Sequence, residues 1–221
     1  MSAPRATYDI SLVLRPGVPE WPGDTPYSCG WTLRMEDGGG FNLSRIEMSP
    51  HVGTHADAPL HVLADGAASE DFPLEVFRGP AHVVELPDAL RERADLTEPG
   101  VGFAELAPFL PDRVERLLLR TGATTADGGF PARWPALTPA CIHALCDRGL
   151  RLLGVDSPSV DPRERRSLDT HAALFARGAY NLENLDLRSV PAGVYELVAY
   201  PLRLAGLDAA PVRAVLMAPE A

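Results

Sequence analysis

The sequence contains no lysine, so all 20 of its basic residues are arginine. This absence excludes several enzyme classes, because Schiff-base enzymes, pyridoxal-phosphate enzymes, Walker-type phosphate loops and lysine-activated nucleophiles all need a lysine side chain. Positive charge is also in deficit, with a net charge of −10. Nucleic acids and anionic lipid surfaces bind positive patches, so we expect neither nucleic acid nor membrane as a partner.

Cysteine is rare, and long apolar runs are missing. Cys29, Cys141 and Cys146 are odd in number and include no C-x-x-C pair, which suits a reducing compartment and predicts no catalytic thiol. Pro, Gly or charged residues interrupt every apolar stretch before it reaches the ~20 residues of a membrane helix. The N-terminus does not have the pattern of a signal peptide. We therefore predict a cytoplasmic protein.

The composition that is present suits one globular domain spanning residues 1–221. With 46% apolar and 23% charged residues, a chain of 221 residues can bury a substantial core. Short apolar or alternating runs bounded by Gly and Pro predict strands, at 8–14, 32–35, 41–47, 82–86, 116–121, 150–156 and 195–202. Helix signals are fewer and predict helices at 103–110, 138–145 and 167–177, the last capped by Ser167 or Asp169. The fold class is therefore α/β, a mixed β-sheet core flanked by a few helices.

One segment concentrates the chemistry. Three of the six histidines lie within eleven residues, at His51, His55 and His61, together with Asp57. All four occupy odd positions, so an extended chain would present them on one face. A straight strand, however, rises ~3.3 Å per residue and would place His51 and His55 about 13 Å apart, too far for one metal ion. We therefore expect the chain to bend between them.

Gly53 stands where that bend is needed, because glycine accepts backbone angles that other residues resist. A helix is disfavoured, since Gly53 and Pro59 both interrupt it. Imidazole and carboxylate groups are the ligands of zinc, manganese and iron sites, and a carboxylate can bridge two ions. The segment therefore predicts a metal site on a kinked strand or loop, with Asp57 as the candidate bridge.

Two motifs together resemble the cyclase family of metal-dependent hydrolases, and in particular its formamidase branch. They are H-x-G-T-H-x-D-x-P-x-H at 51–61 and W-P-G-D-T-P at 21–26. The resemblance runs through residues 9–11 and 153–157 to Glu183-Asn184-Leu185. It implies a swivelling β/β/α-like fold, a homodimer, and two divalent metal ions per subunit, zinc or alternatively manganese.

The resemblance also implies roles for individual residues. His51, His55 and Asp57 match ligands of a first ion, and Asp57 is shared between the two ions. His171 matches a ligand of the second ion, and Glu183 matches a second bridging carboxylate. His61 matches the proton-transferring residue, and Trp21 matches a substrate contact. The residues themselves give uneven support. A carboxylate between Leu182 and Leu185 needs a partner if that segment is buried, and a metal would supply one. Trp21 suits either a core anchor or a flat wall for an aromatic ring.

The implied reaction is the hydrolysis of N-formyl-L-kynurenine, a small aromatic formamide, to L-kynurenine and formate during tryptophan degradation. Two alternatives stay open: hydrolysis of a cyclic amide such as isatin, and a non-catalytic metal-binding protein. A serine formamidase is excluded, because neither a G-x-S-x-G elbow nor an HGG-like oxyanion loop occurs.

Overall fold

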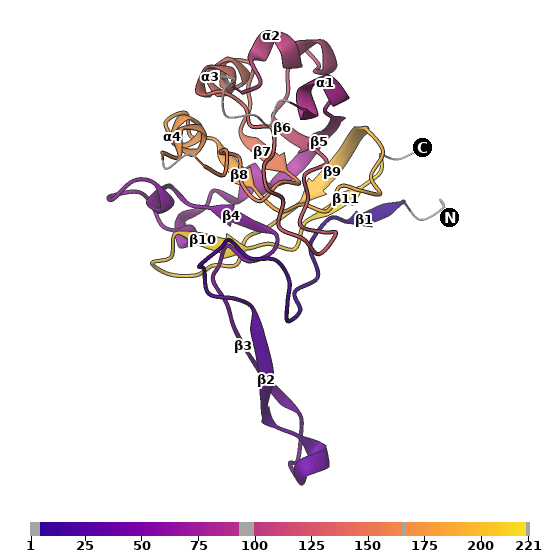
Figure 1. Ribbon diagram of the computed structural model, residues 1–221, viewed down its shortest axis with the longest axis vertical. Coiled ribbons are helices and arrows are strands. Elements are labelled where there is room, and N and C mark those ends of the chain that lie inside the picture. The colour runs from indigo at the N-terminus through magenta and orange to yellow at the C-terminus, as the bar shows by residue number, and fades with distance from the viewer. Residues whose placement is uncertain (1–4, 93–99, 165–166, 220–221) are drawn as a thin grey trace.

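The computed structural model of this chain describes residues 5–92, 100–164 and 167–219. Within these ranges, seven strands form one sheet in the order β1-β11-β9-β5-β6-β7-β8 (Figure 1). They are β1 (Thr7–Asp9), β5 (Arg78–Glu85), β6 (Arg116–Arg120), β7 (Leu152–Val155), β8 (Tyr180–Leu182), β9 (Gly193–Val198) and β11 (Val215–Met217). Strands β5 to β8 are parallel, and β9, β11 and β1 add on in antiparallel pairs. The sheet is mixed, as the sequence predicts.

Helices cover one face of this sheet. They are α1 (Asp88–Arg91), α2 (Phe103–Leu106), α3 (Pro139–Asp147) and α4 (Asp169–Phe175). Short 3-10 turns also occur, at Met35–Asp37, Pro59–His61, Ser69–Asp71, Leu74–Phe77 and Ala107–Phe109. None of the helices in the described ranges is long and apolar enough to cross a membrane.

The sheet separates two apolar cores, because successive side chains of a strand point to opposite faces. In β6, Leu117 and Leu119 pack toward the helices, whereas Leu118 packs on the other side. That second core also contains Ala56 and Ala210, from the short strand pair β4 (His55–Asp57) and β10 (Ala209–Pro211). The pair β4–β10 therefore forms a layer against the face that the helices leave open (Figure 1).

Predicted and observed elements agree best where burial is complete. The runs at 116–121 and 150–156 become the buried strands β6 and β7, and the helix at 138–145 becomes α3, whose Thr138 side chain accepts from Cys141 N. The strand predicted at 8–14 stops at Asp9, because Leu12 N donates to Thr54 Oγ1 instead of to a neighbouring strand.

The predicted cap of α4 is wrong. Neither Ser167 nor Asp169 caps the helix, and Asp169 lies inside it. The carboxylate of Asp161 accepts from the backbone N–H groups of Thr170 and His171 at 2.8 and 3.1 Å. A residue distant in the sequence thus satisfies the first turn, which local capping rules do not anticipate.

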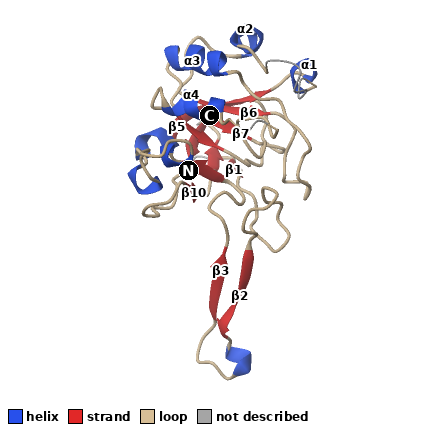
Figure 2. Cartoon of the chain, turned by 60° about the vertical axis from the view of Figure 1, so that its left-hand side comes forward, coloured by secondary structure: helices blue, strands red, loops and turns tan. Residues whose placement is uncertain are grey.

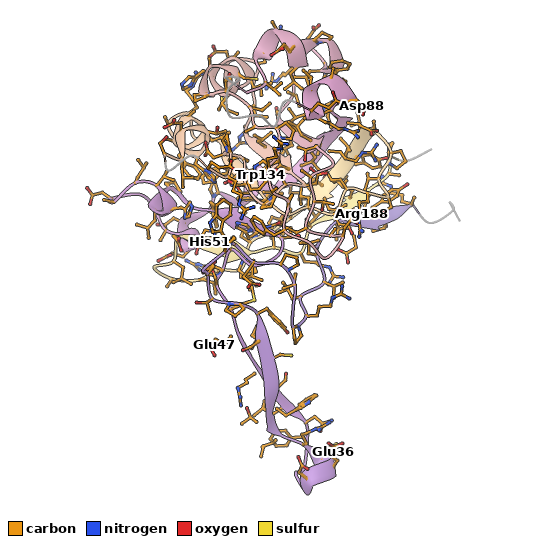
Figure 3. The ribbon with its side chains drawn as sticks, viewed as in Figure 1. Glu36, Glu47, His51, Asp88, Trp134 and Arg188 are labelled. Atoms are coloured by element: carbon orange, nitrogen blue, oxygen red, sulfur yellow. The ribbon has the colours of Figure 1, made fainter. Side chains whose placement is uncertain are left out.

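Strands β2 (Ser28–Leu33) and β3 (Leu43–Glu47) form a hairpin that stands away from the rest of the protein as an arm (Figure 2). Glu36 and Glu47 mark its length in Figure 3, far from the helices. Apolar side chains along the arm are exposed: Trp31, Leu33, Met35, Phe41, Leu43 and Ile46. Exposed apolar residues in one contiguous element indicate a surface that contacts another molecule.

Candidate active site

The predicted bend at Gly53 is present and creates the floor of the site. Gly53 has φ 75°, in the left-handed region that favours glycine. The chain turns there and enters β4, so His55 and Asp57 share one face of a buried strand while His51 lies in the preceding turn. An isolated bridge between His55 and Glu183 places the residue after β8 beside β4.

Two groups of side chains meet at the carboxylates of Asp57 and Glu183. In the first group, Asp57 Oδ1 lies 2.9 Å from His51 Nδ1 and 3.3 Å from His55 Nε2, and Glu183 Oε2 lies 3.4 Å from His55 Nε2. In the second group, His171 Nε2 lies 3.0 Å from Asp57 Oδ2 and 3.1 Å from Glu183 Oε1. Each carboxylate therefore turns one oxygen toward each group, as bridging carboxylates between two ions would.

Each of the three histidines is oriented through its other ring nitrogen. His55 Nδ1 bonds the carbonyl oxygen of Gly53 at 2.9 Å, and His171 Nδ1 bonds Asp161 Oδ2 at 2.7 Å. His51 Nε2 bonds Asp208 Oδ2 at 3.0 Å. Metal-binding histidines characteristically donate their second N–H in this way, which fixes the tautomer and the ring plane.

The electrostatics of the site follow from this packing. Burial by itself lowers the pKa of an imidazole, but the carboxylates outweigh it. The carboxylates of Asp208 and Asp57 raise the pKa of His51 to about 9, and those of Asp57 and Glu183 raise the pKa of His55 to about 10. Burial and the charge of Asp57 oppose ionisation of Glu183, yet His171 and His55 lower its pKa to about 2. Without a bound cation, imidazolium protons thus neutralise the two carboxylates.

Buried polar atoms without hydrogen-bond partners give independent support for a metal centre at this site. Among the described residues, five buried side-chain nitrogen or oxygen atoms have no hydrogen-bond partner, and three of them lie at this site: His55 Nε2, Asp57 Oδ1 and Asn181 Oδ1. Orphaned buried polar atoms are costly, and a cation would satisfy them. Two overlapping sets also have ligand atoms close enough for an ion: His51 with Asp57 and His61, and His55 with Asp57 and Glu183. Imidazole and carboxylate donors suit zinc or manganese.

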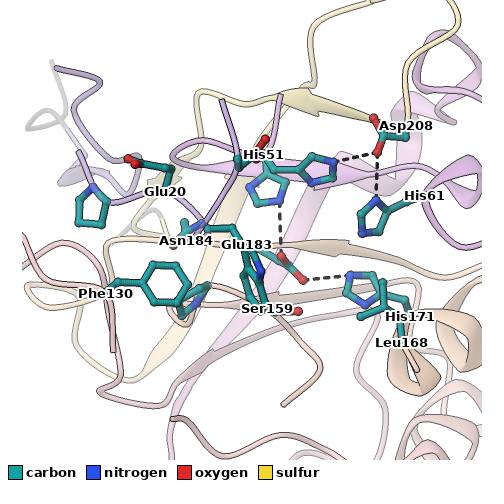
Figure 4. Close-up of a pocket in the computed structure, with 15 residues that line it drawn as sticks. Glu20, His51, His61, Phe130, Ser159, Leu168, His171, Glu183, Asn184 and Asp208 are labelled. Atoms are coloured by element: carbon teal, nitrogen blue, oxygen red, sulfur yellow. Dashed lines mark hydrogen bonds and ion pairs between the residues drawn. The ribbon is translucent and has the colours of Figure 1, made fainter. Parts of the chain in front are cut away.

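His61 lies beside these groups at the end of the 3-10 turn Pro59–His61. Its Nδ1 bonds Asp208 Oδ2 at 3.0 Å, so one oxygen of Asp208 accepts from both His51 and His61 (Figure 4). Asp208 stands just before β10, where its carbonyl oxygen accepts from Ala58 N at 2.8 Å. The pairing of β10 with β4 therefore carries Asp208 to the site.

Three residues of the site are not apparent from the sequence patterns: Asp161, Asn181 and Asp208. Asp161 and Asp208 are two of 30 acidic residues, with no local pattern to distinguish them. Asn181 did carry a signal, because an amide inside the apolar run around Leu182 needs a buried partner. All seven residues predicted from the sequence lie at one site, and six of them line or face the two carboxylate-centred groups.

A pocket of about 420 Å³ opens above these groups. Trp21 forms part of its wall, 39% exposed, with its ring at 5.6 Å from Phe130 in an edge-to-face contact. Trp134 supports both rings from below, at 6.0 Å from each. Trp21 is therefore neither a core anchor nor a free surface residue but part of an aromatic cluster at the pocket wall. His61, His171 and Asp208 also line the pocket and lie across it from Phe130 (Figure 4).

Known sequences share this chain's pattern. Residues 8–162 match the Cyclase family, whose description reads "Putative cyclase". A curated relative from Salinibacter ruber (strain DSM 13855 / M31), named "Kynurenine formamidase", is 42% identical over 213 residues, which cover 96% of this chain and 97% of the relative.

Solved structures share its fold. The structure named "The Structure Of Potential Metal-Dependent Hydrolase With Cyclase Activity" has a TM-score of 0.80 and 29% identity, covering 98% of this chain and 99% of that one. Isatin hydrolase A from Labrenzia aggregata, bound to benzyl benzoate, also has a TM-score of 0.80, with 24% identity over 96% of this chain and 93% of its own. At that identity the likeness concerns the fold.

Proposed function

The chain belongs to the cyclase family, and on this premise we propose that it is a kynurenine formamidase. Such an enzyme hydrolyses N-formyl-L-kynurenine to L-kynurenine and formate, a step of tryptophan degradation. The observation that carries the proposal is the position of Asp57 and Glu183, each turning one oxygen toward either group of histidines at the floor of the pocket. The 42% identity to a named formamidase supports this substrate over a cyclic amide.

Two divalent cations, proposed to be zinc with manganese as the alternative, would be held by these side chains. His51 and His55 face the first position, His171 faces the second, and Asp57 and Glu183 face both. When bound, such ions lower the pKa of water and polarise a carbonyl oxygen.

His61 is proposed to move the proton. Its Nδ1 donates to Asp208, which leaves Nε2 as the basic nitrogen of a ring that lines the pocket. In the reaction, water oxygen bonds the formyl carbon, the C–N bond breaks, and a proton passes from water to the departing nitrogen. An imidazole that accepts the proton from water and returns it to nitrogen serves both halves of this transfer. The departing group is an arylamine, which leaves more readily than an alkylamine.

Trp21 and Phe130 are proposed to hold the aromatic ring of the substrate. Their edge-to-face contact keeps the wall rigid, and Trp134 fixes it from behind, with its Nε1 donating to the Asp161 carbonyl oxygen at 2.9 Å. A flat aromatic wall favours aryl substrates over aliphatic amides, because aromatic pairs gain about 0.5–1.5 kcal/mol beyond area burial.

A homodimer is proposed as the working form, supported by the arm. Trp31, Met35 and Ile46 are 50%, 60% and 65% exposed, on an element that packs little against its own chain. Light scattering on the purified protein measures the mass directly; a monomer that keeps full activity contradicts this part of the proposal.

A cytoplasmic location is also proposed, supported by three cysteines that are all free.

Substrate choice is tested by offering N-formyl-L-kynurenine and isatin to the same metal-loaded sample. The proposal expects turnover of the formamide at a kcat/KM at least tenfold higher than that of isatin. Preference for isatin would make the chain a cyclic-amide hydrolase. Full metal binding with turnover of neither substrate would favour a non-catalytic metal-binding protein. Such a protein would not need the hydrogen-bonded pair of His61 and Asp208 for proton transfer.

A further inference from the structure

We propose that Asn181 is a further metal ligand, whose amide oxygen completes the set formed by His171, Asp57 and Glu183. The inference rests on the proposed two-ion site and extends it to a residue outside the ligand set that the family resemblance implies. It also distinguishes the two ion positions chemically.

Asn181 lies in the middle of β8 and points to the same face as Glu183, because residues two apart on an extended chain share a face. Its side chain is fully buried. The terminal amide nitrogen lies 2.6 Å from Asp57 Oδ2, 3.1 Å from Glu183 Oε1 and 3.2 Å from His171 Nε2. The strand thus directs an amide at the three atoms that face the second ion position.

The spacing of these contacts is close to that between the ligand atoms of one cation. His171 Nε2 is itself 3.0 Å from Asp57 Oδ2 and 3.1 Å from Glu183 Oε1. In a tetrahedral site with bonds of about 2.0–2.1 Å, the ligand atoms are about 3.3 Å apart. The end of the Asn181 amide lies 2.6–3.2 Å from each of these three atoms, near enough to share one ion with them. A cation bonded to the other three atoms would therefore lie at bonding distance from the amide.

The two ends of the amide have opposite roles. An NH₂ group donates hydrogen bonds and cannot bind a cation, whereas the amide oxygen is an acceptor with two lone pairs. With the nitrogen toward Asp57 and Glu183, Oδ1 is buried and has no hydrogen-bond partner. A half-turn about the last side-chain bond of Asn181 exchanges the positions of its NH₂ group and its oxygen, which are similar in size. We infer that the nitrogen bonds the carboxylates without a cation and that the oxygen faces the cation when one binds.

The two positions then differ in donor set. The first has two imidazoles, His51 and His55, with two carboxylate oxygens; the second has one imidazole, His171, with three oxygens. Oxygen donors favour harder ions, so the second position should accept manganese more readily than the first. Loss of the second ion should not require loss of the first.

The experiment measures metal content and affinity by equilibrium dialysis and elemental analysis on purified full-length protein. Wild type should bind two zinc ions per chain. Asn181→Leu, similar in size but without a donor, should keep one ion and bind the second more than about tenfold less tightly, since even residues that only orient a ligand cost about 10–100-fold. Asn181→Asp, which keeps an oxygen at the same place, should retain both ions.

Tyr180→Phe is the matched control on the same strand, because Tyr180 does not line the pocket and the substitution keeps the ring that packs against Phe72, Phe77 and Phe175. It should bind metal as wild type does, and the far-ultraviolet circular dichroism of each variant checks its fold. Unchanged or tighter binding of the second ion by Asn181→Leu would overturn the assignment of Asn181 alone. Binding of fewer than two ions by wild type would overturn the proposed two-ion function instead.

A crystal structure of the zinc-loaded wild-type protein tests the proposed coordination by Asn181 without any variant. Asn181 Oδ1 should lie at about 2.0–2.2 Å from the ion held by His171. An amide turned away from an occupied second position would overturn the proposal.

Discussion

The carboxylate of Asp208 accepts from the imidazole of His61 at 3.0 Å, and the same oxygen accepts from His51 at 3.0 Å. One acidic residue therefore orients both a proposed metal ligand and the proposed proton-transferring group. His51 and the neighbouring His61 lower the pKa of the Asp208 carboxyl well below its usual range, which keeps it ionised as an acceptor throughout the neutral range.

Removing Asp208 should impair proton transfer even when the metal is present. Without the acceptor, His61 loses the hydrogen bond that selects its tautomer, so Asp208→Ala should lower kcat by about 10²-fold at saturating zinc with a smaller change in KM. Asp208→Asn keeps an acceptor oxygen and should retain more activity. The measurement is steady-state kinetics with metal content determined on each sample.

A double-variant cycle separates this role from a structural one. His61→Ala should keep its full metal content and lose about 10²–10⁴-fold in kcat. At saturating zinc, where the effect of Asp208 on His51 and metal binding is compensated, adding Asp208→Ala should lower kcat little further, because Asp208 acts on proton transfer through His61. Asp65→Ala, an exposed carboxylate elsewhere, is the control. Near-normal turnover of a metal-replete His61→Ala protein, or additive losses in the cycle, would refute the assigned roles.

The aromatic wall should act on binding more than on chemistry. Trp21→Leu removes one flat face of the pocket, so KM for N-formyl-L-kynurenine should rise about tenfold while kcat changes less, since a contact made equally in the ground and transition states alters KM. Phe109→Leu, an exposed aromatic outside the pocket, should leave both constants unchanged. A fall in kcat at constant KM would show that Trp21 acts on the transition state instead.

Gly53 should be required for the bend. An alanine there would adopt a φ of 75° and place its Cβ 2.5 Å from Leu14 Cδ2. Gly17 has a similar φ of 83°, and a Cβ added there would meet nothing within 4 Å, so Gly17→Ala isolates the backbone strain. We expect Gly17→Ala to cost about 1 kcal/mol and Gly53→Ala about 2–3 kcal/mol in free energy of unfolding, with weaker zinc binding only in the latter. Equal losses in both variants would show that the contact with Leu14 is irrelevant.

Metal binding should release protons at neutral pH. The pKa values of His51 and His55 are raised to about 9 and about 10, so both rings are protonated near pH 7 without a cation, and an ion must displace those protons. Affinity should therefore weaken as pH falls from about 10 to 7. Proton release during zinc titration in a weakly buffered solution measures this. A proton count of zero at pH 7, with tight zinc binding, would mean that the rings are already neutral.

The sequence predicted the part of the site that is local. His51, His55 and Asp57 lie within one short segment, so their spacing and Gly53 together reveal a bent ligand strand. His171 and Glu183 were identified through family resemblance, because a helix start and a single buried carboxylate are ambiguous by themselves. Asp208 could not be found, since it reaches His61 only through the pairing of β10 with β4.

In the fold, too, local features were predicted and contacts between distant segments were not. Buried strands such as β6 are apparent from continuous apolar runs, whereas the order β9-β5-β6 depends on contacts between distant segments. In the arm, the strand predicted at 41–47 contains β3, whereas the one predicted at 32–35 overlaps only the last two residues of β2, and the projection of the arm was not predicted. Trp31 and Ile46 are exposed in the arm. The sequence pattern of such apolar residues is the same whether they pack against their own chain or against another molecule, so the pattern does not predict a projecting arm.

The central claim, a two-ion formamidase, is tested most directly by titrating zinc into chelator-stripped protein while measuring turnover of N-formyl-L-kynurenine and metal content on the same samples. The account predicts no measurable turnover in the stripped protein and a rise to full activity as zinc content approaches two ions per chain. Full turnover in the stripped protein, or none in folded protein that holds two ions, would contradict it.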